Sequence, residues 1–419
     1  MNSRERVLSA INYQKPDRVP IDFGGHRSSG ISAITYAKLK KALGIDTGDI
    51  YVYDFIQQLA IIEPSVLDAL GSDVIELGRA YLLEPDDWKV WELPDGTPCK
   101  IPWYVETFKE GDDWFLLDRE GNRSAVQKKG CLYFEQLYYP LSERGIENDD
   151  FSDLEQILPL NMWSAAPSPG AHFDLANEKE FKLCEDGAKA LRASTDRAII
   201  GLFGGNLFET PQFLYSAENY LFYLAAFPEK VMELSQKLTE IYLSNLERFL
   251  AAVGDHIDII LFGDDLGTNQ GPMIDPEMYR TFYKPFHKIM WTRVKELAPH
   301  LKIQLHSCGG IEPFMEDLID AGLDMVNPVQ INAHTMDPAS IKGKYRGRFC
   351  FWGGGCNTQE VLNRKSPDEV EAHVKSQLDI WKPYEGFVFQ QVHNILGDVP
   401  VENIIRMFET VHKDYKTGE

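Results

Sequence analysis

The sequence has few cysteines, little positive charge and no long apolar run. Its six cysteines are scattered through 419 residues, which favours a reduced protein whose functional thiols act as ligands or nucleophiles. No apolar run reaches the roughly 18 residues of a membrane span, so we expect no membrane segment. The N-terminal stretch also lacks the apolar segment of a signal peptide, and we therefore expect a cytoplasmic protein.

The shortage of positive charge argues against two classes of partner. Lys and Arg together number 42 against 64 Asp and Glu, and the formal net charge is -22. A surface of this sign repels nucleic-acid phosphates and anionic membranes, so we expect neither as a partner. A small-molecule substrate and neutral or basic protein partners fit better, and a homodimer is compatible with the sequence.

Eight mostly apolar segments alternate with helical patterns and predict eight parallel strands. They lie near residues 19, 74, 198, 257, 302, 324, 348 and 386. Strands buried on both faces read as continuous apolar runs. Eight βα units form a closed (β/α)8 TIM barrel, so the expected fold class is α/β. An open, doubly wound sheet ranks lower because no Gly-x-Gly-x-x-Gly follows the first strand.

The helical patterns between the strands have recognisable ends. Ser366–Glu369 is a capping box with proline in the first turn. Asp275 and Pro276 are an N-cap and a first-turn proline. The expected helices span residues 3–13, 31–44, 65–70, 216–226, 228–253, 276–297, 311–321, 366–381 and 400–414.

Between about residues 80 and 165 the βα pattern stops. Trp88, Trp91, Trp103 and Trp114 alternate with charges there, and Pro94–Gly96 and Arg119–Asn122 have the composition of hairpin turns. This pattern predicts an antiparallel β-rich insertion after strand 2. We interpret it as a cap subdomain over the barrel mouth, within a single domain of residues 1–419; the alternative is a subdomain that only packs on the barrel.

The stretch Lys302–Gly310 reads as a buried strand that runs into a turn. His306 and Cys308 are two residues apart, so on an extended backbone their side chains point to the same side. One imidazole and one thiol make half of a tetrahedral zinc site. Gly309 lets the chain turn sharply and keeps space open above the pair. The pair therefore predicts a zinc site, although a buried cysteine also serves as a small hydrophobe.

A third ligand is expected at another strand end. Active sites of such barrels lie at the carboxyl ends of the strands, where residues distant in sequence meet. His393, which ends the last strand, is our choice, and Cys356, which ends the strand before it, is the rival. The plainer interpretation of His393 is a polar side chain bonded to Asn394 or Asp398.

Further polar residues at the strand ends are candidates for substrate contact. Asp265 or Glu209 is a candidate for a fourth, weaker or substrate-displaced metal ligand, and Arg27 lies in a polar stretch suited to anions. We predict Asp265 and Arg27 as catalytic residues. The predicted substrate-binding residues are His26, Arg27, Glu209, Asp264, Asp265 and Gln330. The alternative for Asp264 and Asp265 is a capped loop.

Motifs from end to end resemble the uroporphyrinogen decarboxylase superfamily. They are Arg4–Leu8, Asp17–Pro20, Phe208–Glu209, Glu218–Asn219, Asp264–Thr268, His306–Gly309, Gly386–Phe387 and Asp398–Ile404. The resemblance covers the chain except for the insertion. It implies a (β/α)8 barrel, in agreement with the strand count.

The superfamily has two functional branches. One decarboxylates uroporphyrinogen without a cofactor and carries Arg-Gln-Ala-Gly-Arg after the first strand, where this sequence has Gly24–Ser29 with a single arginine. The other comprises zinc-dependent methyltransferases that work with corrinoid proteins. That branch uses His-x-Cys after strand 5, matched by His306 and Cys308, and a cysteine at the end of strand 8, where this sequence has His393.

The resemblance and the residues together predict a zinc-dependent methyltransferase. It would exchange a methyl group between a small substrate, such as a methyl ether or thiol, and a corrinoid carried by a separate protein, because no Asp-x-His-x-x-Gly corrinoid-binding motif is visible. A neutral His393 in place of a thiolate makes zinc more electrophilic and favours an oxygen leaving group. The alternatives are a cofactor-free decarboxylase of uroporphyrinogen or a related aromatic carboxylate, and a non-catalytic barrel that binds a small ligand.

Overall fold

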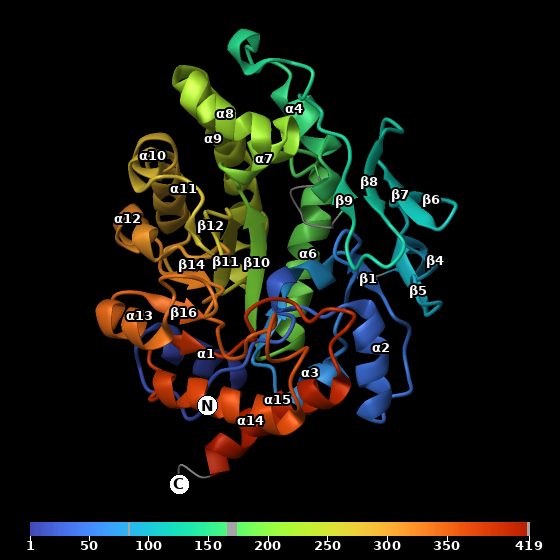
Figure 1. Cartoon of the computed structure of the whole chain (residues 1–419), viewed down its shortest axis with the longest axis vertical. Coiled ribbons are helices and arrows are strands. Elements are labelled where there is room, and N and C mark those ends of the chain that lie inside the picture. Colours follow the sequence, from blue (N-terminus) through green and yellow to red (C-terminus); the bar gives the residue numbers. More distant parts are fainter. Residues whose placement is uncertain (83, 166–173, 417–419) are drawn as a thin grey trace.

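The computed structural model describes residues 1–82, 84–165 and 174–416 (Figure 1). At its centre seven parallel strands form a curled sheet in the order β17-β16-β15-β14-β11-β10-β3. Their bounds are β3 (Val74–Glu76), β10 (Ala198–Gly204), β11 (Ile259–Gly263), β14 (Lys302–His306), β15 (Met325–Asn327), β16 (Cys350–Trp352) and β17 (Phe387–Val388). Helices alternate with these strands, which confirms the predicted α/β barrel.

The first predicted strand closes the sheet as a short bridge. Ile21 pairs in parallel with Phe389, and the Asp22 N–H donates to the Phe389 oxygen at 2.8 Å. On the other side the Asp73 N–H donates to the Ile21 oxygen at 2.7 Å. The segment stays short because Pro20 has no N–H to extend the ladder.

Helices surround this sheet. Their bounds are α1 (Ser3–Ile11), α2 (Ala33–Ala42), α3 (Pro64–Leu70), α4 (Leu154–Ile157), α6 (Glu178–Ser194), α7 (Glu209–Tyr215), α8 (Ala217–Ala226), α9 (Pro228–Val253), α10 (Pro276–Phe282), α11 (Lys284–Leu297), α12 (Met315–Ala321), α13 (Pro338–Tyr345), α14 (Pro367–Trp381) and α15 (Val401–Lys416). Among the described residues, none of the helices combines the length and apolar character that a membrane crossing needs.

Several predicted bounds need correction. The single helix expected over 276–297 is two helices, because Pro285 lacks an N–H and its ring opposes the carbonyl four residues before it. The strands expected at 257–265, 324–330, 348–356 and 386–393 are shorter than predicted. Their polar and glycine-rich ends are loops at the barrel mouth. The helices α6, α7 and α13 were not predicted.

The insertion consists of antiparallel strands, as predicted. One sheet pairs β4 (Trp88–Glu92) with β5 (Pro98–Pro102). The other joins β6 (Glu106–Glu110), β7 (Asp113–Leu117), β8 (Arg123–Gln127) and β9 (Glu135–Gln136). In Figure 1 these sheets lie on the side of the barrel away from α10–α13. The hairpin of β1 (Val52–Asp54) and β2 (Leu59–Ala60) was not predicted. The function of the insertion as a cap stays a prediction.

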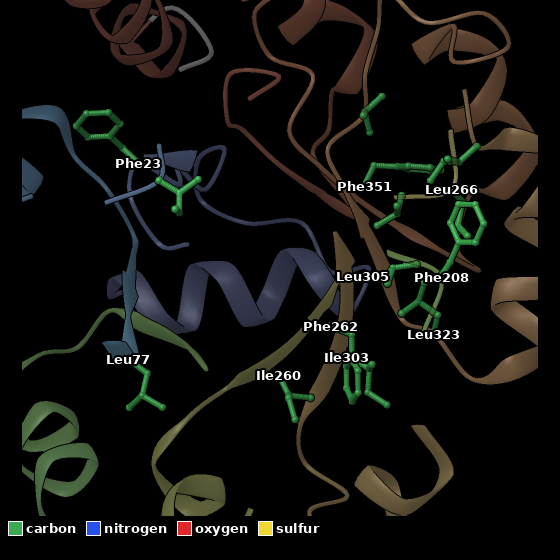
Figure 2. Close-up of a cluster of buried hydrophobic side chains, with 14 of the residues drawn as sticks. Phe23, Leu77, Phe208, Ile260, Phe262, Leu266, Ile303, Leu305, Leu323 and Phe351 are labelled. Carbon is green, nitrogen blue, oxygen red and sulfur yellow. The ribbon is translucent and has the colours of Figure 1, made fainter. Parts of the chain in front are cut away.

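The alternation of side chains along the strands separates two layers of core. Ile260 and Phe262 of β11 belong to the larger hydrophobic cluster, which includes the residues of Figure 2. Ile259 and Leu261 belong to a second cluster with Val7 of α1. Because alternate residues of a strand face opposite sides, the second cluster fills the barrel interior and α1 closes its amino-terminal end. The open end is therefore formed by the loops that follow the strands.

Candidate metal centre

Three side chains that are potential zinc ligands meet at this open end. His306 ends β14, Cys308 follows two residues later, and His393 lies in the loop after β17. One ligand atom from each of them lies within 4.8 Å of the other two. The Cys308 sulfur is 3.5 Å from His306 Nε2, and the two imidazole centroids are 5.7 Å apart. The strand geometry thus places the His-x-Cys pair on one side, and the fold brings His393 to it.

A directed chain of hydrogen bonds fixes which nitrogen of His306 faces this cluster. Gln390 donates through Nε2 to the Ser28 main-chain oxygen at 2.9 Å, so its Oε1 accepts from Asn327 Nδ2 at 2.7 Å. Asn327 therefore presents Oδ1 to His306 Nδ1 at 2.9 Å. Because that oxygen can only accept, Nδ1 carries the proton and Nε2 keeps its lone pair for the cluster.

A second chain fixes His393 in the same tautomer. The buried Asp54 carboxylate accepts from Gln57 Nε2 at 3.1 Å, so Gln57 Oε1 accepts from Asn394 Nδ2 at 2.8 Å. Asn394 Oδ1 then accepts from His393 Nδ1 at 2.5 Å and from the Tyr133 hydroxyl at 2.7 Å. The bond to Asn394 is therefore present, but it leaves Nε2 available. Metal-binding histidines usually make such a bond through their other nitrogen.

Burial sets the protonation of the three side chains. Loss of hydration lowers the pKa of His306, and it lowers the pKa of His393 to about 4, where the neighbouring His306 charge adds to the effect. Burial raises the pKa of the Cys308 thiol well above its usual range, and the Asp265 carboxylate adds to this rise. At neutral pH the cluster holds two neutral imidazoles and a thiol that must lose its proton to bind a metal.

The two carboxylates that follow β11 have different surroundings. Asp264 is fully buried and accepts from the N–H groups of residues 207–209 at 2.9 to 3.2 Å, so it caps the amino end of α7. This is the capped loop that we considered for Asp264, and its predicted role in substrate binding stays a prediction. Asp265 is one-third exposed, accepts from the Cys308 N–H at 2.8 Å and lies 3.7 Å from His306 Nε2.

Glu209 begins α7 beside these carboxylates. Burial and the negative charges of Asp265 and Asp264 raise its pKa well above its usual range. Asn206 Nδ2 donates to it at 2.7 Å. Among the described residues, the group within 4.8 Å includes neither Glu209 nor Asp265, so both stay candidates for a fourth ligand only.

The other residues predicted from the sequence do not belong to the group of three. His26 is fully buried, and Ser28 Oγ links its Nδ1 (3.0 Å) to His306 Nδ1 (2.8 Å), while its role in substrate binding stays a prediction. Arg27 Nε lies 3.4 Å from the Asp54 carboxylate that begins the second chain. Cys356 is fully buried and lies outside the group of three. The structure thus brings His393 to the pair, and not Cys356.

A cavity of about 240 Å³ opens beside the cluster. Its lining residues come from loops that follow five of the strands, and they are Gly267, Thr268, Asn269, Cys308, Gly309, Gln330, Thr358, Gln359, Val392 and His393. Gln330, predicted to bind substrate, accepts from the Gly309 N–H at 2.7 Å and so also holds the turn after Cys308. A molecule in this cavity would contact the sulfur and imidazole of the cluster.

Sequence reasoning missed the residues that orient the two histidines. Asn327 ends β15, and it could have been found as a polar residue at the end of an apolar strand. Asn394 is adjacent to His393, and we named it only as an alternative to metal binding. Tyr133 belongs to the insertion, and no local pattern connects it with the end of the last strand.

The arrangement defines a (β/α)8-barrel protein with a His/Cys cluster at the mouth. The family model of uroporphyrinogen decarboxylase (URO-D) matches residues 173–414, more than half of the chain. The chain therefore belongs to this family, as the sequence motifs predicted. A solved structure of a methyltransferase from Methanosarcina mazei is similar over 99% of each chain, with a TM-score of 0.57 and 14% sequence identity, and it shows the same fold. A search of curated proteins finds no match.

Proposed function

We propose that the protein is a zinc-dependent methyltransferase that exchanges a methyl group between a small substrate and a corrinoid on a separate protein. The observation that carries this proposal is the convergence of His306, Cys308 and His393 beside a cavity. Two imidazoles and one thiolate are donors that zinc prefers, and three protein ligands leave one position for a substrate. The M. mazei methyltransferase with the same fold supports the activity class.

The surroundings of the three side chains fit such a metal. Both imidazoles offer Nε2, and each donates its Nδ1 proton to an amide oxygen that is itself fixed. When bound, zinc supplies a Lewis acid that holds a substrate sulfur or oxygen near its deprotonated form. Asp265 lies 3.7 Å from His306 Nε2, which supports the proposal that its carboxylate accepts a proton at this site. Arg27 acts on the site through Asp54 and the chain to His393.

Metal content tests the proposal. Protein purified with added zinc should hold one zinc per chain, and Cys308→Ala or His393→Ala should lose it. Cys356→Ala is the matched control, because it removes a buried thiol outside the cluster and should keep the metal. Full zinc in Cys308→Ala, or none in the unaltered protein, would contradict the zinc site.

Methyl transfer tests the reaction. The protein is mixed with a reduced corrinoid protein and candidate methyl ethers, and methyl-cobalt formation is followed by absorbance. The reverse mixture combines a methylated corrinoid protein with a thiol acceptor. Transfer in neither direction would contradict the proposed activity.

Decarboxylation of uroporphyrinogen or a related aromatic carboxylate is the second candidate, because the family model that matches the chain is that of uroporphyrinogen decarboxylase. It needs no metal. Release of carbon dioxide from uroporphyrinogen by protein treated with a zinc chelator would favour it over methyl transfer.

A further inference from the structure

The polar side chains that line the cavity beside the cluster have one property in common. Apart from the two cluster residues they are uncharged amides and hydroxyls, namely Thr268, Asn269, Gln330, Thr358 and Gln359. Of the described residues that line this cavity, none is Lys or Arg. The lining therefore offers hydrogen bonds but no positive side chain to pair with an anion.

The amides of this lining form a directed chain. The Gly309 N–H donates to Gln330 Oε1 at 2.7 Å, so the Gln330 nitrogen is the atom that donates to Asn269 Oδ1. Asn269 Nδ2 in turn donates to Gln359 Oε1 at 3.4 Å, which also accepts from Asn332 Nδ2 at 2.8 Å. The amide oxygens of Gln330, Asn269 and Gln359 already accept a hydrogen bond, whereas each NH₂ group has two protons and uses at most one of them in these bonds. This chain of hydrogen bonds therefore leaves N–H donors available at the rim of the cavity.

The charges next to the cavity are negative. Asp265 is one-third exposed beside Cys308. The whole chain carries a formal net charge of -22. Among the side chains, a carboxylate entering here would find hydrogen-bond donors but would also meet the like charge of Asp265, and none of the described lining side chains is a cation, whereas a neutral carbonyl uses the same donors without that repulsion.

We infer that the cavity and its rim bind an uncharged ligand group that carries amide or carbonyl acceptors, and that they discriminate against carboxylates. This inference rests on the proposed function and names the chemical class of its ligand. It also separates the two candidate functions, because the substrate of the decarboxylase carries several carboxylates.

Two ligands of the proposed reaction could supply this chemistry. One is a small methyl-bearing substrate with an amide or carbonyl group, held inside the cavity. The other is the corrinoid of the partner, whose macrocycle is fringed by amide side chains that would meet the exposed Thr268, Asn269 and Gln359 of the rim. Two matched pairs of probes distinguish these sources.

The first pair is 3-methoxybenzamide and 3-methoxybenzoate, which have nearly the same shape and differ in charge. The second pair is cobinamide and cobyrinic acid, in which the same macrocycle carries amides or carboxylates. Equilibrium dialysis against protein from which zinc has been removed gives the four dissociation constants, because bound zinc would itself attract the carboxylate probes. We expect the neutral member of at least one pair to bind at least tenfold more tightly, and the pair that shows the difference identifies the source.

Substitution of the exposed Gln359 tests the location. Gln359→Arg adds a cation to the rim and should reduce or reverse the preference of the responding pair at least tenfold. Gln236→Arg adds the same charge to the exposed face of α9, far along the chain from the cavity lining, and should leave the preference unchanged.

The inference is wrong if the carboxylate member of both pairs binds as tightly as the neutral one. It is also wrong if neither neutral probe binds, or if both arginine variants change the preference equally. Zinc content and methyl transfer are measured on zinc-loaded samples of the same preparations. Zinc and methyl transfer without a neutral preference would overturn this inference alone, whereas a neutral preference without zinc or transfer would overturn the proposed function alone.

Discussion

Removing the amide oxygen that orients His393 should weaken zinc binding. Asn394 Oδ1 accepts from His393 and from Tyr133, and Asn394→Leu replaces the amide by an apolar side chain of similar size. Loss of such a partner typically lowers metal affinity by about 10- to 100-fold, which is about 1.4 to 2.7 kcal/mol. Competition for zinc with a chelating dye measures this change directly.

The same substitution should also destabilise the fold, and this effect must be separated. Asn394 is 1% exposed, and its loss leaves the Tyr133 hydroxyl and Gln57 Oε1 without their partner. Each unsatisfied buried group costs about 1–3 kcal/mol. Asn403→Leu is the matched control, because Asn403 is equally buried and donates to main-chain oxygens of residues 362 and 365, outside both chains.

The two variants should therefore differ in zinc affinity but not in the direction of their stability change. Denaturant unfolding should show both to be less stable than the unaltered protein, while the chelator competition should show weaker zinc binding in Asn394→Leu alone. Asn394→Asp keeps an acceptor for His393 and should retain zinc affinity within about threefold. Normal zinc affinity in Asn394→Leu, or an equal loss in Asn403→Leu, would refute the reasoning.

Three further predictions follow from protonation and backbone geometry. Zinc binding at pH 7 should release about one proton, from Cys308, because the imidazoles are already neutral. Calorimetry in buffers of different ionisation enthalpy counts the protons released. A count of two or more would contradict the pKa directions. The pKa of His393 is about 4 in the fold against about 6.5 in the unfolded chain, so the unfolded chain binds more protons between these two pH values. The free energy of unfolding of the metal-free protein should therefore decrease as the pH falls from about 6.5 to about 4. Urea unfolding should show a shallower decrease for His393→Asn. Gly309→Ala should destabilise by roughly 3 kcal/mol, because Gly309 has φ +87° and a Cβ there would lie 2.3 Å from the Gly267 backbone. Gly343→Ala, in α13 with open space around it, should instead stabilise by roughly 0.5–1 kcal/mol, and equal unfolding midpoints for the two variants would contradict this.

Local chain geometry made much of the fold predictable. Period-two alternation placed His306 and Cys308 on one side of β14, and continuous apolar runs marked the parallel strands. The capping box at Ser366–Glu369 predicted the start of α14. Each of these features depends on residues that are close in sequence. The break between α10 and α11 could also have been read from Pro285, but our prediction started one helix at Asp275 and Pro276 and did not use that signal.

Only the tertiary structure decided which residue joins the His-x-Cys pair. Cys356 and His393 both follow barrel strands, and both are chemically suitable, so sequence left the choice open. In the fold the Cys356 side chain is fully buried and does not belong to the group of three, whereas His393, in the loop after β17, lies within 4.8 Å of the pair. Which of the two side chains reaches the pair depends on the path that each loop takes after its strand, and packing determines that path.

The orientation of the histidines depends on still longer separations. Asn327 meets His306 across neighbouring strands, and Tyr133 of the insertion meets Asn394 although 261 residues separate them. A hydrogen bond is short and directional, so no pattern along the chain encodes its partner. The sequence determined the barrel and the residue types available at its mouth, and the closure of the barrel and the docking of the insertion determined which of them meet.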